Sequence, residues 1–233
     1  MKKNWYFYLL YVVTAVTFLI TIHWISRATS TFVESAPIKR RFSILIDPGH
    51  GGEDGGAISC SGLPESGYNL EIALRLRDLM QFLGSNVRMT RDADISIHQE
   101  GNTIAQKKAS DLKERVRLAN SIENTVLLSI HQNYYPDERY SGAQVFYAGT
   151  ANSDILAKSL QEAFCKVLNP TSNRKSKKCS GVFLMEHLRC TGVLIECGFL
   201  SNQQEDAKLR DANYQKQLCT VIAATVSQFL SNT

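Results

Sequence analysis

The sequence lacks the features that mark several common protein classes. Its six cysteines include no Cys-x-x-Cys pair, which excludes a zinc ribbon and a thioredoxin-like motif. It has no internal repeat, and a net charge of +4 falls short of the basic balance that is typical of nucleic-acid-binding proteins. We therefore expect no nucleic-acid partner, although an anionic polymer is compatible with this charge. With 44% hydrophobic and 21% charged residues among 233, the composition is typical of a folded chain with one good-sized domain.

The N-terminal residues form a long uncharged run. Lys2 and Lys3 are followed by an apolar stretch from residue 4 to residue 26, which is long enough to cross a bilayer core of about 30 Å as a helix. The stretch has no amphipathic period, which disfavours a buried core helix. Trp5 and Trp24 suit the two membrane interfaces. We expect a signal or anchor segment at 1–28, a linker at 29–41 and the remainder at 42–233 to work outside the cytoplasmic membrane. An uncleaved anchor is favoured because no clear small-x-small cleavage site is present, with cleavage as the alternative.

Disulfides would suit this expected location, but the positions of the cysteines argue against a general disulfide framework. Cys165 and Cys219 lie on apolar helical faces and Cys197 lies in an apolar strand, where buried free thiols are ordinary core residues. Pairing of Cys179 with Cys190 is left open.

From residue 42 onward, short apolar runs alternate with stretches of helical periodicity. This alternation predicts a single α/β domain with a roughly six-stranded, mostly parallel or mixed sheet and helices on both faces. Residues 91–110 have no periodicity and are predicted to form a long polar loop. The predicted strands are 42–46, 87–90, 125–130, 143–147, 181–185 and 192–196, and the predicted helices are 70–83, 112–120, 155–168 and 214–230.

Three of the predicted strands end in side chains that can bind a metal or move a proton. His50 follows the first strand, His131 ends the third and Glu196 ends the sixth. Binding sites in α/β sheets lie at the carboxyl ends of strands, so these side chains can converge. Glu65 lies at the start of the next helix. Together with the imidazoles of His50 and His131, its carboxylate forms a donor set for a tetrahedral zinc site with one open position. Glu196 then remains as the carboxylate that accepts a proton from water.

Each of these residues also has a purely structural interpretation. His50 could be part of a Gly-rich turn, and Glu65 could be an acidic residue favoured by a helix N-terminus. A polar group directly after an apolar strand is costly unless it is paired or used, which makes His131 and Glu196 harder to explain structurally.

Two rival interpretations concern other motifs, and a basic run is considered beside them. The Gly-rich stretch 47–56 resembles a phosphate-binding loop but lacks the Gly-Lys-Ser/Thr ending. Cys197 could be a nucleophile, but strand alternation sends it to the face opposite Glu196. The basic run 174–178 is either a solvated loop or a contact for an anionic wall polymer.

Taken together, the motifs resemble the zinc-dependent N-acetylmuramoyl-L-alanine amidases of the type 3 class over about residues 42–231. The resemblance implies zinc ligands at His50, Glu65 and His131 and a catalytic acid/base at Glu196. Arg115, Asn133 and Asn202 lie in the shared motifs, and we expect them to contact substrate. The motifs are 46–52 (IDPGHGG), Glu65 with Asn69-Leu70, 90–92 (TRD), Arg115 to Asn120, 129–133 (SIHQN) and 194–202 (LIECGFLSN).

A more detailed resemblance is to the germination-specific amidases of spore-forming bacteria, carried by residues 100–102, 108–117, 141–147 and 173–185. It implies removal of the stem peptide from muramic acid in spore cortex peptidoglycan, so that a deacetylase can complete a muramic-δ-lactam needed for germination. It also implies a location between the membranes of the forespore. Ser66-Gly67 departs from the Lys-Asp usual after the ligand glutamate, and six cysteines are unusual for the family.

Two other functions compete with this one. The domain could be a catalytically silent peptidoglycan-binding or sensor module, or a zinc peptidase that cuts within the stem peptide. Because only an anchor and a linker lie outside the expected catalytic domain, we also expect an extracytoplasmic accessory protein to assist activity or metal loading.

Overall fold

The computed structural model describes the backbone of residues 3–33 and 42–233 and the side chains of 5–23 and 42–233. It forms two units, residues 1–40 and 41–233. Most of the predicted linker (34–41) and the side chain of Trp24 lie outside the described residues.

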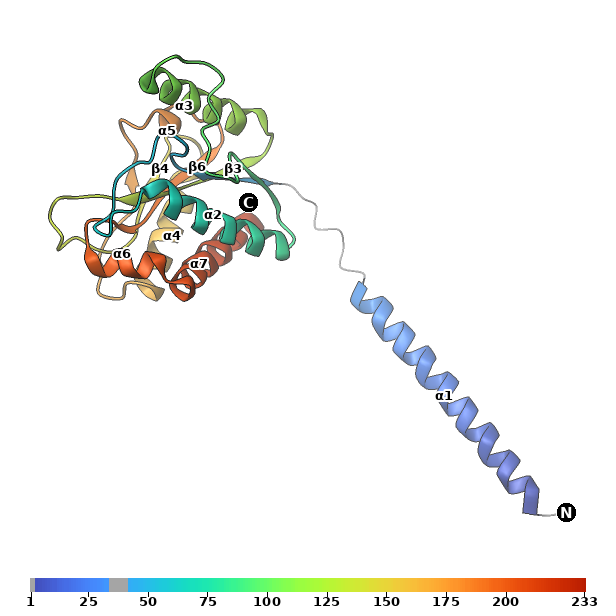
Figure 1. The fold of residues 1–233 in the computed structure, drawn as a ribbon. Helices are drawn as coiled ribbons and strands as arrows, with labels where there is room; N and C mark the ends of the chain where they lie inside the picture. The colour runs from blue at the N-terminus through green and yellow to red at the C-terminus, as the bar shows by residue number, and fades with distance from the viewer. Residues whose placement is uncertain (1–2, 34–41) are drawn as a thin grey trace. The chain divides into compact units, whose positions relative to one another are not determined.

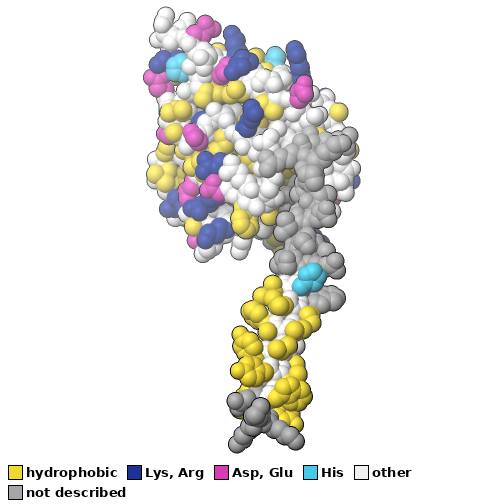
Figure 2. Space-filling view, turned by 90° about the vertical axis from the view of Figure 1, so that its right-hand side faces the viewer, with side chains coloured by type: hydrophobic (Ala, Val, Ile, Leu, Met, Phe, Trp, Pro, Cys, Tyr) yellow, Lys and Arg dark blue, Asp and Glu magenta, His cyan; other side chains and the backbone are white. Residues whose placement is uncertain are grey.

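The first unit is a helix, α1 (Lys3–Val33). Its segment Trp5–His23 has a mean hydropathy of 1.9 and is not buried anywhere. Hydrophobic side chains cover its described length, with no Lys, Arg, Asp or Glu among them (Figure 2). By length and composition this helix can cross a membrane, and a signal sequence has the same properties.

The second unit is built on one six-stranded sheet of order β2-β1-β3-β6-β4-β5. β4 pairs antiparallel with β6, and all the other pairs are parallel, so the prediction of a mostly parallel, mixed sheet is confirmed. The central strands are buried on both faces, which explains their continuous apolar sequences. The bounds are β1 (Ser43–Pro48), β2 (Asn86–Met89), β3 (Thr125–Asn133), β4 (Gln144–Tyr147), β5 (Lys177–Lys178) and β6 (Thr191–Phe199).

Helices cover both faces of the sheet, as the sequence predicts (Figure 1). On one face, α2 (Glu65–Phe82), α4 (Ser153–Val167) and α7 (Ala212–Ser231) enclose the larger core cluster, which includes Ile46, Leu128 and Ile195. On the other face, α3 (Ile104–Ser121) and α5 (Phe183–Glu186) cover a smaller cluster that includes Leu127 and Leu194. α6 (Gln203–Arg210) precedes α7. The odd and even positions of each central strand therefore belong to different cores.

One predicted strand is wrong. Residues 181–185 were predicted to be extended, but Gly181 has a φ of +76° and the helix α5 begins at Phe183. Leu184 and Met185 are consecutive and both buried in the smaller cluster. A strand would point them to opposite faces, whereas one helical turn lets both contact the same core. The fifth strand is instead the two-residue β5.

The boundaries of α3 and α6 also differ from expectation. α3 begins inside the predicted loop 91–110, where Thr103 and Gln106 form a reciprocal capping box. α6 was not predicted because its sequence is almost wholly polar and only Leu209 is an apolar residue buried from it. Its start is fixed by Asn202, whose Oδ1 accepts hydrogen bonds from the backbone of Gln204 and Glu205.

Candidate metal centre and active site

The loop that carries His50 begins where β1 ends. His50 has a φ of +60°, a conformation that is unfavourable for a residue with a side chain. Two buried guanidinium groups hold this backbone: Arg115 donates to the carbonyls of Pro48 and His50, both at 2.8 Å, and Arg91 donates to those of Pro48 and Gly49 at 3.0 and 2.9 Å. The strained position of His50 is thus fixed by hydrogen bonds from β2's end and from α3.

Arg115 also forms a buried ion pair with Asp47 at 2.5 Å. Burial alone would raise the pKa of Asp47, but the charge of Arg115 and hydrogen bonds from Thr90 and Ser129 lower it below its ordinary value. Asp47 is therefore a charged, structural residue at the base of the His50 loop.

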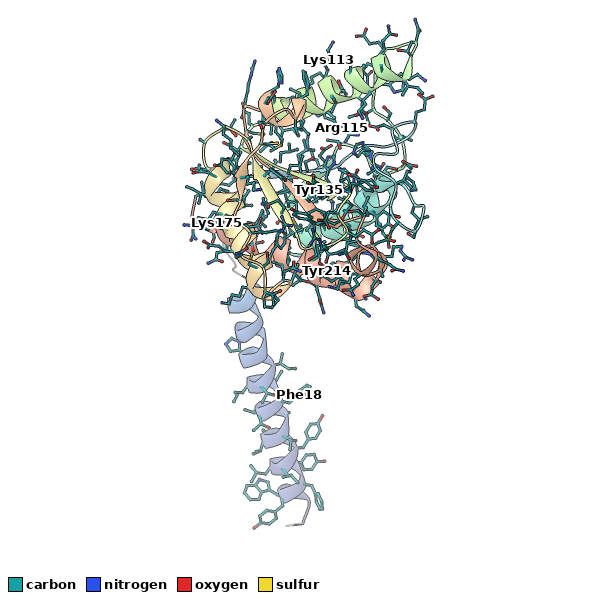
Figure 3. All side chains as sticks on the ribbon, turned by 90° about the vertical axis from the view of Figure 1, so that its left-hand side faces the viewer. Phe18, Lys113, Arg115, Tyr135, Lys175 and Tyr214 are labelled. Atoms are coloured by element: carbon teal, nitrogen blue, oxygen red, sulfur yellow. The ribbon has the colours of Figure 1, made fainter. Side chains whose placement is uncertain are left out.

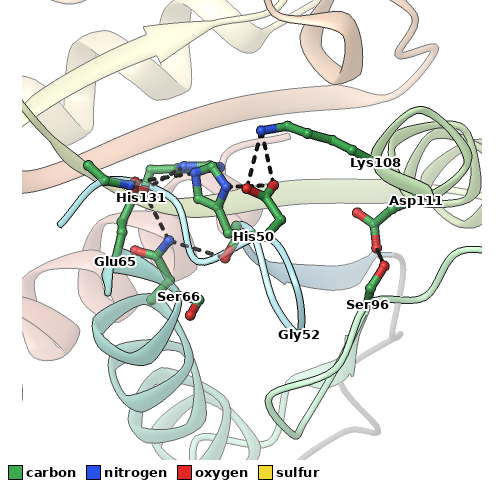
Figure 4. A network of polar contacts seen from close by, with 12 residues as sticks. His50, Gly52, Glu65, Ser66, Ser96, Lys108, Asp111 and His131 are labelled. Atoms are coloured by element: carbon green, nitrogen blue, oxygen red, sulfur yellow. Dashed lines mark hydrogen bonds and ion pairs between the residues drawn. The ribbon is translucent and has the colours of Figure 1, made fainter. Parts of the chain in front are cut away.

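Three side chains from different elements meet at the carboxyl edge of the sheet (Figure 4). His50 Nε2 lies 3.2 Å from Glu65 Oε2, and His131 Nδ1 lies 3.0 Å from Glu65 Oε1. One ligand atom from each residue lies within 4.8 Å of the others. Two imidazole nitrogens and a carboxylate oxygen are a donor set that suits zinc.

Two glycines leave room for this cluster. A Cβ on Gly49 would lie 2.1 Å from Cε1 of His131, and a Cβ on Gly56 would lie 2.6 Å from Oε2 of Glu65. A neighbouring group would have to shift at either position, so glycine at both lets His50, Glu65 and His131 approach one another.

The electrostatics of the cluster favour a positive charge. Burial would lower the pKa of His50, but Asp54 and Glu65 raise it to about 9. Burial would raise the pKa of Glu65, but the two histidines lower it well below its ordinary value. These carboxylates stabilise a cation between the rings, whether it is a proton or a metal ion. The site therefore fits a bound cation on both geometry and charge.

Both oxygens of Glu65 are held in place. Oε1 accepts hydrogen bonds from Asn69 Nδ2 and from the backbone of Gln132, each at 3.1 Å, and Oε2 accepts one from the backbone of Ala57 at 3.1 Å. Asn69 lies one helical turn after Glu65 on α2, so its side chain reaches the same face. The glutamate is therefore oriented before any ligand arrives.

Glu196 lies directly beside this cluster, because β6 pairs Glu196 with His131 of β3. Burial raises the pKa of Glu196 to about 7. Its Oε2 is one of two buried side-chain oxygens without a hydrogen-bond partner among the described residues. Because an unpartnered buried carboxylate oxygen is costly, this atom is a strong candidate for contact with water or substrate. Cys197 points to the other face and packs in the larger core cluster.

The three predicted substrate contacts lie in different surroundings. Arg115 is only 2% exposed, and its guanidinium is engaged by Asp47, Asp111 and two carbonyls. Asn202 caps α6 and donates to the carbonyl of Glu138 at 2.6 Å. Asn133 is half-buried at the end of β3, and none of the described residues hydrogen-bonds its side chain. Of the three, Asn133 is the one placed and free to meet a substrate.

Sequence reasoning missed two residues that support His50. Asp54 Oδ2 contacts His50 Nδ1 at 2.9 Å, and Lys108 Nζ contacts Asp54 at 3.2 Å (Figure 4). The spacing of Asp54 from His50 gives no signal in an irregular loop, and Lys108 comes from a helix whose start was not predicted.

The comparison with protein families identifies the family to which the chain belongs. A family model described as N-acetylmuramoyl-L-alanine amidase matches residues 44–228. The chain belongs to this amidase family. It is 40% identical over 190 residues to the germination-specific N-acetylmuramoyl-L-alanine amidase of Bacillus subtilis (strain 168), covering 81% of this chain and 79% of that protein. The predicted resemblance to germination-specific amidases is confirmed.

Solved amidase structures agree with this assignment. The amidase resembles CwlD from Clostridioides difficile, which was solved in complex with the GerS lipoprotein, with a TM-score of 0.78 and 35% identity over 82% of this chain and 99% of that one. It also resembles an N-acetylmuramoyl-L-alanine amidase from Clostridium difficile 630, with a TM-score of 0.71 and 29% identity over 82% and 97% of the two chains. The match spans nearly all of each solved chain.

Proposed function

We propose that this amidase is zinc-dependent and cleaves the amide between the lactyl group of muramic acid and L-alanine in spore cortex peptidoglycan. The observation that carries the proposal is the convergence of His50, Glu65 and His131 beside the unpartnered Oε2 of Glu196. In this proposal residues 1–28 are the signal or anchor, 29–41 the linker and 42–233 the amidase domain.

In the proposed mechanism, His50, Glu65 and His131 hold the zinc ion, and Glu196 moves the protons. Bound zinc supplies Lewis acidity, which polarises the amide carbonyl and makes water more acidic. Glu196 accepts a proton from the attacking water on the carboxylate, and the same group then donates it to the leaving amine of L-alanine. A pKa near 7 suits both halves of this cycle, because the group can take and release a proton at neutral pH.

The products define the place of the reaction in cortex maturation. Cleavage leaves a free carboxyl group on the lactyl side chain of muramic acid and a free stem peptide. A deacetylase that exposes the amine of the same sugar would then allow the carboxyl and the amine to close a lactam. We propose this order because of the similarity to a germination-specific amidase, together with a location outside the cytoplasmic membrane, between the forespore membranes.

We also propose that an extracytoplasmic accessory protein assists this amidase. The solved structure of CwlD from Clostridioides difficile is a complex with the GerS lipoprotein.

The experiment incubates the full-length protein, in detergent, with purified cortex peptidoglycan, with and without a chelator. The masses of the released fragments are then recorded. Chelator-sensitive loss of whole stem peptides supports the proposal, whereas a one- or two-residue stub left on muramic acid would identify a peptidase. Bound zinc with an unchanged spectrum, in the presence of membrane extract as a source of partners, would identify a binding module.

A further inference from the structure

Aromatic side chains lie exposed at the same edge of the sheet as the active site. We define the aromatic cluster as Tyr135, Tyr140 and Phe199. The rings of Tyr135 and Tyr140 meet edge to face with centroids 4.7 Å apart, and the ring of Tyr140 lies 6.2 Å from that of Phe199. Phe199 is buried, whereas Tyr135 and Tyr140 are 49% and 45% exposed. Two touching rings open to solvent form an apolar surface that the core does not need.

The loop that presents these tyrosines, residues 134–142, is held at several points. The backbone of Tyr135 donates to Ser201 Oγ at 3.3 Å, and the carbonyl of Glu138 accepts from Asn202 at 2.6 Å. At the far end of the loop, the backbone of Gly142 donates to the buried carboxylate of Glu205 at 2.7 Å. The rings are therefore presented in a fixed arrangement, and a ligand that binds them loses little loop entropy.

Phe199 is the buried member of the aromatic cluster and is held by a contact with Arg174. The guanidinium of Arg174 lies over its ring, 5.0 Å from the centroid, and also donates to the carbonyl of Ser141 at 3.2 Å. Arg174 therefore links the basic run 174–178 to the loop that carries the tyrosines.

The aromatic cluster lies at the same carboxyl edge of the sheet as Glu196. Phe199 follows Glu196 by three residues on β6, which corresponds to about 10 Å of strand. Asn133, two residues after His131, pairs with Phe199 across the sheet. Figure 3, which views the domain from the left of Figure 1, shows Tyr135 near the middle of the domain, below Arg115. A polymer bound at Glu196 can therefore extend onto the rings.

The two sides of the site differ in chemistry. On the α3 side, two ion pairs line the His50 loop: Lys107 with Glu53 and Lys108 with Asp54. The other side presents tyrosine rings. The bond that the family cleaves joins a sugar to a peptide, so the substrate has a glycan part and a peptide part to be bound. Peptide stems carry charged groups, whereas sugar rings have apolar C–H faces that stack on aromatic rings.

We propose that Tyr135 and Tyr140 form a glycan subsite, which binds sugars of the strand next to the muramic acid whose amide is cut. This subsite rests on the proposed amidase function and locates the glycan part of the substrate. The two rings bind the strand and take no part in proton transfer.

The test measures binding without cleavage, by titration calorimetry of the full-length protein in detergent. The probe is soluble glycan strands from which all stem peptides have been removed. The wild type is expected to bind them. Tyr135→Ala and Tyr140→Ala should each weaken binding by roughly tenfold, the scale of one lost aromatic contact. Tyr135→Phe and Tyr140→Phe should bind like the wild type because they keep the ring. Phe82→Ala, which removes an 88% exposed ring at the other end of α2, is the matched control and should change nothing.

A kinetic measurement with two substrates tests the same subsite. For long strands, the alanine variants should raise KM and leave kcat unchanged. For a muramoyl peptide with a single sugar, which has no neighbouring sugar to bind the rings, both constants should stay the same. Wild-type binding of glycan strands by both alanine variants would overturn the proposal, as would displacement of the strands by free stem peptide. Tyrosine-dependent glycan binding without any cleavage would instead contradict the amidase proposal and leave the subsite standing.

Discussion

Asp54 contacts His50 through the ring nitrogen that faces away from Glu65. A carboxylate only accepts hydrogen bonds, so Nδ1 of His50 carries the proton and Nε2 is left as the donor atom for a metal. Lys108 in turn contacts Asp54, which joins α3 to the metal centre.

We expect Asp54→Ala to weaken zinc binding by about 10- to 100-fold, the usual effect of removing the partner of a histidine ligand. Lys108→Met should weaken it less, because it removes only the support of Asp54. Lys107→Met is the control, since Lys107 pairs with Glu53 on the same loop, away from His50. Competition with a chromophoric chelator measures the affinity. Equal effects of Lys107→Met and Lys108→Met would show that the contact with Asp54 has no special role.

We expect Glu196→Gln to retain zinc and to lose at least about 10²-fold in kcat, because the amide can neither accept nor donate the catalytic proton. In the wild type, kcat/KM should rise with pH as Glu196 ionises, at a pH below about 7, because burial raises the pKa of Glu196 to about 7 in the metal-free site and a bound cation lowers it. His131→Ala, in contrast, should lose zinc itself. Full turnover of Glu196→Gln on cortex peptidoglycan would remove Glu196 from the mechanism.

The same burial makes Glu196 a source of instability at high pH. Its pKa is raised on folding, so the folded protein holds the proton more tightly than the unfolded chain does. The penalty is absent below a pH of about 4.5 and complete above about 7, where it reaches at most about 3 kcal/mol. Glu196→Gln should therefore unfold at higher urea concentration than the wild type at pH 8, with metal removed, and show no such advantage at pH 4.5. If Glu196→Gln and the wild type were equally stable at pH 8 as well as at pH 4.5, the raised pKa of Glu196 would be contradicted.

We expect Arg115 to stabilise the folded protein and to make no contact with substrate. Arg115→Met leaves the carboxylate of Asp47 buried without its partner, which should cost about 3–5 kcal/mol of unfolding free energy. The pKa of Asp47 is lowered in the folded state, so this stabilisation is present above the ordinary aspartate pKa and is lost as the pH falls through the lowered value. Arg117→Met, two residues on and in an exposed pair with Glu114, should leave the urea midpoint unchanged. A stable Arg115→Met protein with a raised KM would restore the role of Arg115 in binding substrate.

Two glycines near the ligands offer a sharp contrast. Gly49→Ala should abolish metal binding, because the new methyl group would occupy the place of the His131 ring. Gly67→Ala should keep it and stabilise the protein by about 0.5–1 kcal/mol, since Gly67 lies in α2 with open space around it. Metal content and melting temperature check both variants. Normal metal content in Gly49→Ala would show that His131 does not need to pack on this backbone.

Apolar strands and amphipathic helices were predictable from the sequence because burial imposes a period on them. The strands β1, β3 and β6 are continuous apolar runs, and the side chains that follow or interrupt them gave His50, His131 and Glu196 as candidates. The topology then places them together, because β1, β3 and β6 are neighbours in the sheet.

What the sequence could not show was polar support. α6 buries charged and polar residues through specific hydrogen bonds, and these leave no apolar period. The clamp of Arg91 and Arg115 on the His50 backbone depends on contacts between residues more than 40 positions apart. The strand predicted at 181–185 was wrong because an apolar run of four residues fits a strand or one helical turn equally well.

The three proposed ligands are separated by up to 81 positions in sequence and become neighbours only when β3 pairs with β1 and α2 packs against both. An unfolded chain presents no such trio, so an ion that prefers this site binds the native state more tightly than the unfolded chain. A bound metal ion then stabilises the whole domain. The melting temperature should rise with free metal concentration, and depletion of metal would expose the domain to proteases as well as stop hydrolysis.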